Sequence, residues 1–209
     1  MTTTELITVV IVDDHPVVRD GLSAILSTEP DLKVAGEAGT GEEAMRVIPA
    51  LRPNIVLMDL MLPDMMGSDV IRRICADISD IDFIVLTSVA GDEDIFRALD
   101  AGARGYLFKD MARKELIQSI RKVRAGERYL PTEVGSKLAE SYPRNPLSDR
   151  EIAVLQYLAA GHRNKEIAYK LELSENTVNA HVKRIFEKLG VTDRTHAVTT
   201  ALRRGIIHL

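Results

Sequence analysis

The sequence predicts an α/β protein with a doubly wound, five-stranded parallel sheet, followed by a second, small all-α domain. Two observations predict the sheet: short β-branched apolar runs recur over roughly the first 110 residues, and segments with helical spacing lie between them. A third predicts the second domain: after Leu147 the strand-like runs stop and only short helical patterns follow.

Each predicted element follows from its apolar spacing. Four continuous apolar runs predict buried strands, at 7–12, 55–58, 83–86 and 105–108, and a weaker run at 33–37 predicts the fifth. Between them, helical spacing predicts helices at about 16–28, 41–51, 67–78, 93–101 and 113–125. In the first helix we expect one side to face the core, formed by Val17, Leu22, Ile25 and Leu26.

Four of the predicted strands lead directly into side chains that carry chemistry. These are Asp13 and Asp14, Asp59, Thr87 and Lys109. Because open parallel sheets bind ligands beyond the carboxyl ends of their strands, we expect these groups to meet in one crevice. Three clustered carboxylates repel one another, so the cluster predicts a hard divalent cation such as Mg²⁺.

This set of groups predicts phosphoryl chemistry. Asp59 suits a nucleophile that becomes an aspartyl phosphate, with Asp13 and Asp14 holding Mg²⁺. Lys109 would neutralise charge on the transferring oxygens, and Thr87 would donate a hydrogen bond to one of them. Each residue alone has a plainer interpretation, such as a turn, a strand or a solvated loop charge; their joint occurrence at strand ends favours function.

At these positions the chain resembles the receiver domain of bacterial two-component response regulators. The matching segments are Asp13-Asp14-His15-Pro16, Met58-Asp59-Leu60-Met61-Leu62-Pro63, Thr87-Ser88 and Gly105-Tyr106-Leu107-Phe108-Lys109. The resemblance implies that Asp59 is the phosphoacceptor and that the Met61 carbonyl is a metal ligand. It further implies that Thr87 and Tyr106 form a switch pair and that the small Ser88 leaves access to the phosphoryl group. The strand order that the resemblance implies is 2-1-3-4-5.

Other interpretations of the acidic cluster are weaker. His15 could belong to a catalytic triad, but no serine occurs in a Gly-x-Ser-x-Gly motif, so we interpret His15 as a supporting residue. A phosphatase with an aspartate nucleophile usually has a second acid two residues later, where this chain has Met61. A receiver that only binds partners would be expected to lose part of the acidic cluster. We therefore expect no enzymatic activity other than self-phosphorylation from a phosphodonor and slow autodephosphorylation.

Composition agrees with a globular protein of one or two domains. The 209 residues are 45% hydrophobic and 28% charged, and the single Cys75 excludes an internal disulfide or a cysteine metal cluster. A basic leader is missing at the start of the chain, and no apolar run approaches the length of roughly 20 residues that a membrane helix needs. We expect a cytoplasmic protein without a membrane partner.

The sequence divides into domains at a proline-punctuated stretch. We predict a first domain at 1–126, a linker at 127–145 with a short helix near 132–141, and a second domain at 146–209. The second domain holds ten Lys and Arg against seven Asp and Glu, whereas residues 1–145 hold seventeen against twenty-four. The net positive charge of the second domain, beside an acidic first part of the chain, favours an anionic partner for the second domain.

Three cap signals organise the second domain. Ser148 and Glu151 form a capping box that begins a helix to about Ala160, Asn164 is expected to cap the next helix, and Ser174 begins a helix from Glu175 to Leu189. Two short helices joined by a tight turn form a helix-turn-helix, whose second helix enters the DNA major groove.

The helical spacing assigns the faces of that second helix. Val178, Val182, Ile185 and Leu189 share the side that we expect to pack on the core. The other side should reach DNA, with base contacts expected for Asn176, Asn179, Ala180 and Lys183. Phosphate contacts are expected for Thr177, Arg184 and Lys188. A plain amphipathic helix with a solvated polar face is the alternative.

A second resemblance favours DNA binding. The segments Leu147-Ser148, Asn164-Lys165-Glu166-Ile167-Ala168, Ser174-Glu175-Asn176-Thr177-Val178 and His181-Val182 resemble the LuxR-type helix-turn-helix, which adds Lys165 to the expected DNA contacts. With the receiver, they identify the chain as similar to the NarL/FixJ response regulators. Asn179 departs from the family, which often has lysine there.

The resemblance also implies partners. They are a sensor histidine kinase or a small phosphodonor, promoter DNA, RNA polymerase, and a second copy of the chain when phosphorylated. The last helix, near His196 to Arg204, commonly pairs subunits in this family, and its apolar contact would come from Val198, Ala201 and Leu202.

Overall fold

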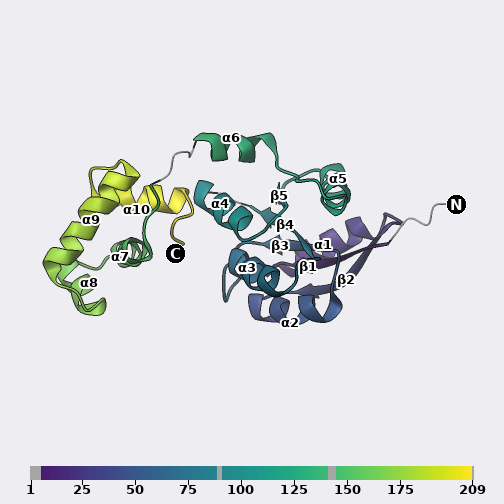
Figure 1. The fold of residues 1–209 in the computed structure, drawn as a ribbon, viewed down its shortest axis with the longest axis horizontal. Coiled ribbons are helices and arrows are strands. Elements are labelled where there is room, and N and C mark those ends of the chain that lie inside the picture. The colour runs from purple at the N-terminus through teal and green to yellow at the C-terminus, as the bar shows by residue number, and fades with distance from the viewer. Residues whose placement is uncertain (1–5, 89–90, 141–144, 209) are drawn as a thin grey trace. The chain divides into compact units, whose positions relative to one another are not determined.

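The computed structural model describes residues 6–88, 91–140 and 145–208. Within these residues the chain forms two compact units, one built around a sheet and one built from helices (Figure 1). The predicted linker residues Tyr142, Pro143 and Arg144 lie outside the described residues. No helix in the described ranges is long and apolar enough to cross a membrane.

The first unit contains one five-stranded parallel sheet. Its strands are β1 (Ile7–Val12), β2 (Leu32–Ala38), β3 (Ile55–Asp59), β4 (Asp82–Thr87) and β5 (Gly105–Phe108). They lie in the order β2-β1-β3-β4-β5, which confirms the predicted fold class and strand order. This order reverses its direction at β1, and the ends of β1 and β3 on either side of that point carry Asp13 and Asp59.

Five helices follow the strands in turn. They are α1 (Pro16–Leu26), α2 (Gly41–Leu51), α3 (Gly67–Asp77), α4 (Asp92–Asp100) and α5 (Arg113–Arg124). The predicted ranges differ from these by one or two residues at the ends. Such differences are expected because apolar spacing specifies the middle of a helix better than its ends.

Side-chain alternation along the strands gives the sheet two buried faces. One face packs against α1 and α5, and its core consists of Val9, Ile11, Ile55, Leu57, Ile84, Leu86 and Leu107 from the strands with Leu22, Leu26, Leu116, Ile117, Ile120 and Val123 from the helices. The other face packs against α2, where a Cβ on Gly36 would lie within 2.5 Å of Leu51. Helices on both faces make the fold doubly wound.

One predicted core position in α1 is wrong. Val17 is 82% exposed, whereas Val18, Leu22, Ile25 and Leu26 pack in or against the core. Pro16 is the first residue of the helix, so Val17 lies in the first turn, before the helix crosses the sheet. Val18 lies four residues before Leu22, so helical spacing places it on the same side as Leu22 and Leu26. In the structure Val18, rather than Val17, packs against the core.

The second unit is helical. It contains α7 (Asp149–Ala159), α8 (Asn164–Lys170), α9 (Glu175–Leu189) and α10 (Arg194–Arg203), and the short α6 (Thr132–Glu140) precedes it in the chain. Ser148 forms the predicted capping box with Glu151, and Ser174 caps α9 by accepting from the Thr177 N–H. The core of this unit includes Val154, Leu158, Ile167, Val178, Ile185, Ala197 and Ala201.

The cap of α8 differs from the prediction. The N-cap is Arg163, whose backbone N–H donates to the Glu166 carboxylate at 2.7 Å, and Asn164 is the first helical residue. The side chain of Asn164 is therefore not used as a cap. After α8, Glu172 has φ 54° and turns the chain tightly toward Ser174 and α9. This is the helix-turn-helix that the sequence predicts.

Candidate phosphoryl site and DNA-contact helix

The four strand ends bring the predicted chemical groups together. Asp13 follows β1 and is 1% exposed, while Asp59 ends β3 and is 3% exposed. Thr87 ends β4 and is 2% exposed. The Lys109 backbone N–H, just beyond β5, donates to the Thr87 carbonyl at 2.9 Å. The parallel register therefore fixes the relative positions of these residues without help from the loops.

Lys109 bridges the two buried carboxylates. Its Nζ lies 2.7 Å from Asp13 Oδ2 and 2.8 Å from Asp59 Oδ2. Burial alone would lower the pKa of the Lys109 ammonium, but the hydrogen bonds to Asp13 and Asp59 outweigh burial and raise its pKa. Lys109 is therefore a permanent positive charge beside Asp59.

Burial dominates the titration of Asp59. It raises the pKa of the Asp59 carboxyl above its usual value of 3.8, and the nearby charge of Asp13 adds to the increase. The hydrogen bond from Lys109 lowers the pKa but does not cancel the effect of burial. A cation beside Asp59 would favour the carboxylate, which is the nucleophilic form.

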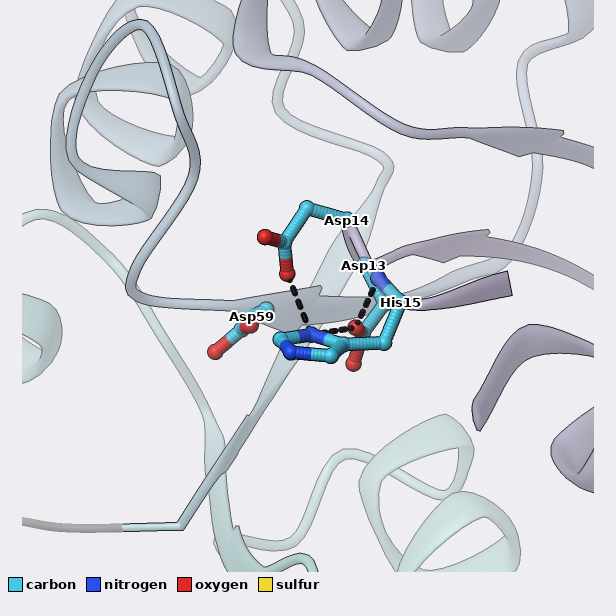
Figure 2. A group of neighbouring side chains, drawn as sticks. All are labelled: Asp13, Asp14, His15 and Asp59. Carbon is cyan, nitrogen blue, oxygen red and sulfur yellow. Dashed lines mark hydrogen bonds and ion pairs between the residues drawn. The ribbon is translucent and has the colours of Figure 1, made fainter. Parts of the chain in front are cut away.

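Asp14 and His15 complete the acidic cluster (Figure 2). The His15 Nδ1 lies 3.3 Å from Asp13 Oδ1 and also contacts Asp14 Oδ1. One ligand atom from each of Asp13, Asp14, His15 and Asp59 lies within 4.8 Å of the others. Opposite ligands around Mg²⁺ lie about 4.2 Å apart, so the cluster is of the right size for one hard cation. His15 contacts the Asp13 and Asp14 carboxylates, as a residue that orients metal ligands does.

The other predicted pocket residues lie near the same edge. The Met61 backbone N–H donates to Asp59 Oδ1 at 3.3 Å, which holds the loop after β3 against the carboxylate. Ser88 is exposed directly after Thr87. The Tyr106 ring is completely buried and lies edge-on to Phe108. The structure therefore places Asp13, Asp59, Thr87 and Lys109 at the ends of β1, β3, β4 and β5, with Tyr106 further back on β5, beside Val85.

Two residues that support the pocket were missed in the sequence. Asp64 accepts hydrogen bonds from the backbone N–H groups of Gly41 and Glu42, both at 2.8 Å, and so ties the loop after β3 to the start of α2. Both bonds lower the pKa of the Asp64 carboxyl, and the bond from Gly41 has the larger effect. Arg19 donates to the Asp13 carbonyl at 2.7 Å. No local pattern marks the Asp64 contact, because its partners lie 22 and 23 residues away.

The faces of α9 agree with the predicted ones. Val178 and Ile185 are completely buried, and Val182, Phe186 and Leu189 pack against the same core. The exposed residues are Asn176, Asn179, Ala180, Lys183, Arg184 and Glu187. Thr177 is half-buried and its hydroxyl lies 2.8 Å from the Ser174 hydroxyl, within the cap. Lys165 is exposed at the start of α8.

Lys188, a predicted phosphate contact, has contacts within its own unit that the sequence does not predict. Its Nζ lies 2.7 Å from Glu151 Oε2 and donates to the Pro146 carbonyl at 3.0 Å. The Glu151 side chain is only 4% exposed and the Lys188 side chain 21%. Lys188 therefore joins α9 to the start of α7, and its contact with a DNA phosphate stays a prediction.

One predicted subunit contact is also corrected. Ala201 is completely buried in the core of its own unit, because its small side chain lies on the inner side of α10. Val198 and Leu202 are only partly buried against that core. Of the three, only Val198 and Leu202 can reach a second chain.

Both units of the chain match known protein families. The family described as the response regulator receiver domain matches residues 9–121, and the luxR family of bacterial regulatory proteins matches residues 145–201. The chain belongs to the response regulators with a LuxR-type DNA-binding domain. Response regulators of this family control transcription through a receiver and a DNA-binding domain, and this chain has both.

Relatives extend over the whole length of this response regulator. The transcriptional regulatory protein LiaR of Bacillus subtilis is 36% identical over 97% of this chain and 100% of its own. The response regulator protein VraR of Staphylococcus aureus is 38% identical over 96% and 99%. Among solved structures, an RcsB–DNA complex has a TM-score of 0.69 and 27% identity, covering 95% of this chain and 99% of its own. ChrA, from a haem-sensing two-component system, has a TM-score of 0.57 and 38% identity, covering 97% and 99%.

Proposed function

We propose that Asp59 accepts a phosphoryl group and that this modification controls DNA binding by α9. The observation that carries the proposal is the position of the Asp59 carboxylate, which is buried, contacts Lys109 at 2.8 Å and belongs to a cluster of cation-ligand groups. An Asp59 oxygen would form a bond to phosphorus while the bond between phosphorus and the donor's leaving group breaks. The chain thus takes part in its own phosphorylation without being an enzyme that acts on other molecules.

The cation site fits Mg²⁺. Asp13, Asp14, Asp59 and the Met61 carbonyl would hold the ion, since carboxylates and carbonyl oxygens are the ligands of hard cations. When bound, Mg²⁺ supplies positive charge that offsets the repulsion among the carboxylates and the phosphoryl oxygens. Lys109, which follows β5 at the same edge of the sheet, provides the second positive charge.

The remaining pocket residues would respond to the phosphoryl group. Thr87 ends β4 next to Lys109, so its hydroxyl can donate to a phosphoryl oxygen. Ser88 is small and exposed beside it and leaves the site accessible. Tyr106 is buried on the strand next to Thr87 and would change its packing when Thr87 moves, as a switch pair requires.

The proposed partners follow from the phosphorylation of Asp59 and from DNA binding by α9. The phosphodonor would be a sensor histidine kinase, and acetyl phosphate can replace it in a test tube. We propose promoter DNA as the ligand of the second domain, RNA polymerase as the partner at the promoter, and a homodimer, formed upon phosphorylation, as the DNA-bound state. In RcsB, two dimers bound to two parallel DNAs have been described. Binding to promoters would place the protein in the cytoplasm.

We keep the predicted domain bounds as part of this proposal. They are a receiver at 1–126, a linker at 127–145 and a DNA-binding domain at 146–209. The family matches at residues 9–121 and 145–201 are compatible with those bounds.

Substitutions in α9 test the DNA-binding part. Lys183 is exposed in the middle of the outer face, so Lys183→Ala should cost about 1–3 kcal/mol of binding free energy and relax the preference for one base pair in each half-site. Arg184→Ala should instead weaken binding to all sequences alike and reduce the salt dependence by about one counterion per site. Binding to a panel of single-base operator variants at several salt concentrations measures both effects. Arg73→Ala, which removes an exposed charge from α3 of the first unit, is the control and should leave binding unchanged. If neither α9 substitution changes binding, α9 does not enter the groove.

A further inference from the structure

We propose that Asn164 fixes the orientation of the Asn179 amide, so that Asn179 presents only hydrogen-bond donors to DNA. The inference rests on the proposed entry of α9 into the major groove. It assigns Asn164 as a positioning residue and Asn179 as a determinant of sequence preference, through a contact between the two helices of the helix-turn-helix.

The contact is short and joins residues that are distant in sequence. Asn164 Nδ2 donates to Asn179 Oδ1 at 2.6 Å, across 15 residues. Asn164 is free to do so because Arg163, not Asn164, is the N-cap of α8. Asn164 is half-buried, whereas Asn179 is exposed. Asn179 also precedes Lys183 by four residues, so both side chains lie on one face of α9. A residue aimed at DNA is therefore held in place from α8.

The hydrogen bond decides which end of the Asn179 amide can meet a base. A free asparagine binds adenine with both ends, accepting from N6 and donating to N7. Here the oxygen of Asn179 is held toward α8, and the NH₂ group lies on the other side of the amide carbon. The NH₂ group can only donate, so it suits base edges that carry acceptors. Guanine offers two adjacent acceptors, O6 and N7, and thymine offers O4.

Asn164→Asp should reverse this preference. A carboxylate only accepts hydrogen bonds, so Asn179 would have to turn its NH₂ group toward the new carboxylate on α8 and its oxygen toward the DNA. The oxygen accepts from cytosine N4 or adenine N6. Asn164→Ala should release the amide instead, so that Asn179 can bind adenine with both ends.

The experiment measures DNA binding by the full-length chain with Mg²⁺ and beryllofluoride, a mimic of the phosphoryl group. A site is first selected from a randomised operator library, and binding is then measured on single-base variants of that site. Asn179→Ala identifies the base pair that Asn179 contacts, and 7-deazapurine in place of each purine, on one strand at a time, identifies the contacted strand. We expect the wild type to prefer guanine or thymine on that strand. At that same position, the Asn164→Asp variant should favour operators with cytosine or adenine over those with guanine or thymine by about tenfold more than the wild type does. The Asn164→Ala variant should have a higher affinity than the wild type for the operator with adenine. Asn176→Ala, which changes another exposed asparagine of α9, should affect a different position.

Three results would overturn the inference. One is a wild-type preference for cytosine at the Asn179 position, a result that needs no Asn164 variant to fold. Another is an Asn164 variant that leaves this preference unchanged. The third is an Asn164 variant that retains its helical circular dichroism but weakens binding to all sequences alike. Failure of the proposed function itself is recognised separately, because the wild type would then show no sequence preference and Lys183→Ala would have no effect.

Discussion

The Asp59→Asn variant should take up no phosphoryl group from acetyl phosphate and Mg²⁺, whereas the wild type should take up one. Asparagine has the size of aspartate but lacks the nucleophilic carboxylate. The intact mass of the protein after incubation measures the modification. Asp20→Asn, which changes an exposed aspartate of α1 outside the cluster, should be labelled like the wild type.

Undiminished labelling of Asp59→Asn would place the phosphoacceptor elsewhere. A lost fold would be a different result, and it is recognised by thermal unfolding. We expect the variant to remain folded, because Lys109 keeps its contact with Asp13 and the asparagine oxygen can still accept from Lys109.

The Lys188→Ala variant should destabilise the DNA-binding domain by about 3 kcal/mol. The substitution leaves the Glu151 carboxylate, 4% exposed, without its charged partner, and an unpaired buried charge is costly. Amide hydrogen exchange of the full chain at α7 and α9 measures the local loss of stability. A double variant, Glu151→Leu with Lys188→Met, removes both charges and should recover much of it.

The pH dependence distinguishes the ion pair from a general packing defect. Burial tends to raise the pKa of Glu151, but Lys188 and Ser148 hydrogen-bond to its carboxylate and bring the pKa below its usual value of 4.5. The stabilisation from this group is therefore present above about pH 4.5 and is lost as the pH falls below that value. The difference between wild type and Lys188→Ala should shrink in that range. If Lys188→Ala instead keeps full stability and weakens binding to all DNA alike, Lys188 is a phosphate contact, as the sequence alone indicates.

The parts of the protein that depend on local pattern could be predicted from the sequence. Buried parallel strands are continuous apolar runs, so β1, β3, β4 and β5 and the polar residues at their ends were identifiable. The parallel register then brings Asp13, Asp59 and Lys109 to one edge, which the structure confirms. Caps of the Ser148 and Ser174 type were identifiable because the capping pattern is local.

The errors, and the Lys188 contact that the sequence does not reveal, concern side chains whose tertiary partners are distant in the chain. Lys188 is bonded to a residue 37 positions away, and Asn164 to one 15 positions away, so helical spacing alone could not reveal either contact. Ala201 and Val17 were misplaced because spacing defines a helical face but not how far the neighbouring elements cover it. Tertiary contacts, rather than local preference, decide these positions.

The most direct test of the account is the affinity of the full-length chain for its operator before and after phosphorylation, compared between wild type and Asp59→Asn at one salt concentration. The operator is selected with the phosphorylated wild type, and the phosphorylated fraction is measured by mass in the same samples. We predict that treatment with acetyl phosphate and Mg²⁺ raises the affinity of the wild type by about tenfold, in the range of ordinary allosteric coupling, and leaves Asp59→Asn unchanged. Equal affinity of the phosphorylated and unphosphorylated wild type, or an equal rise in Asp59→Asn, would contradict the account.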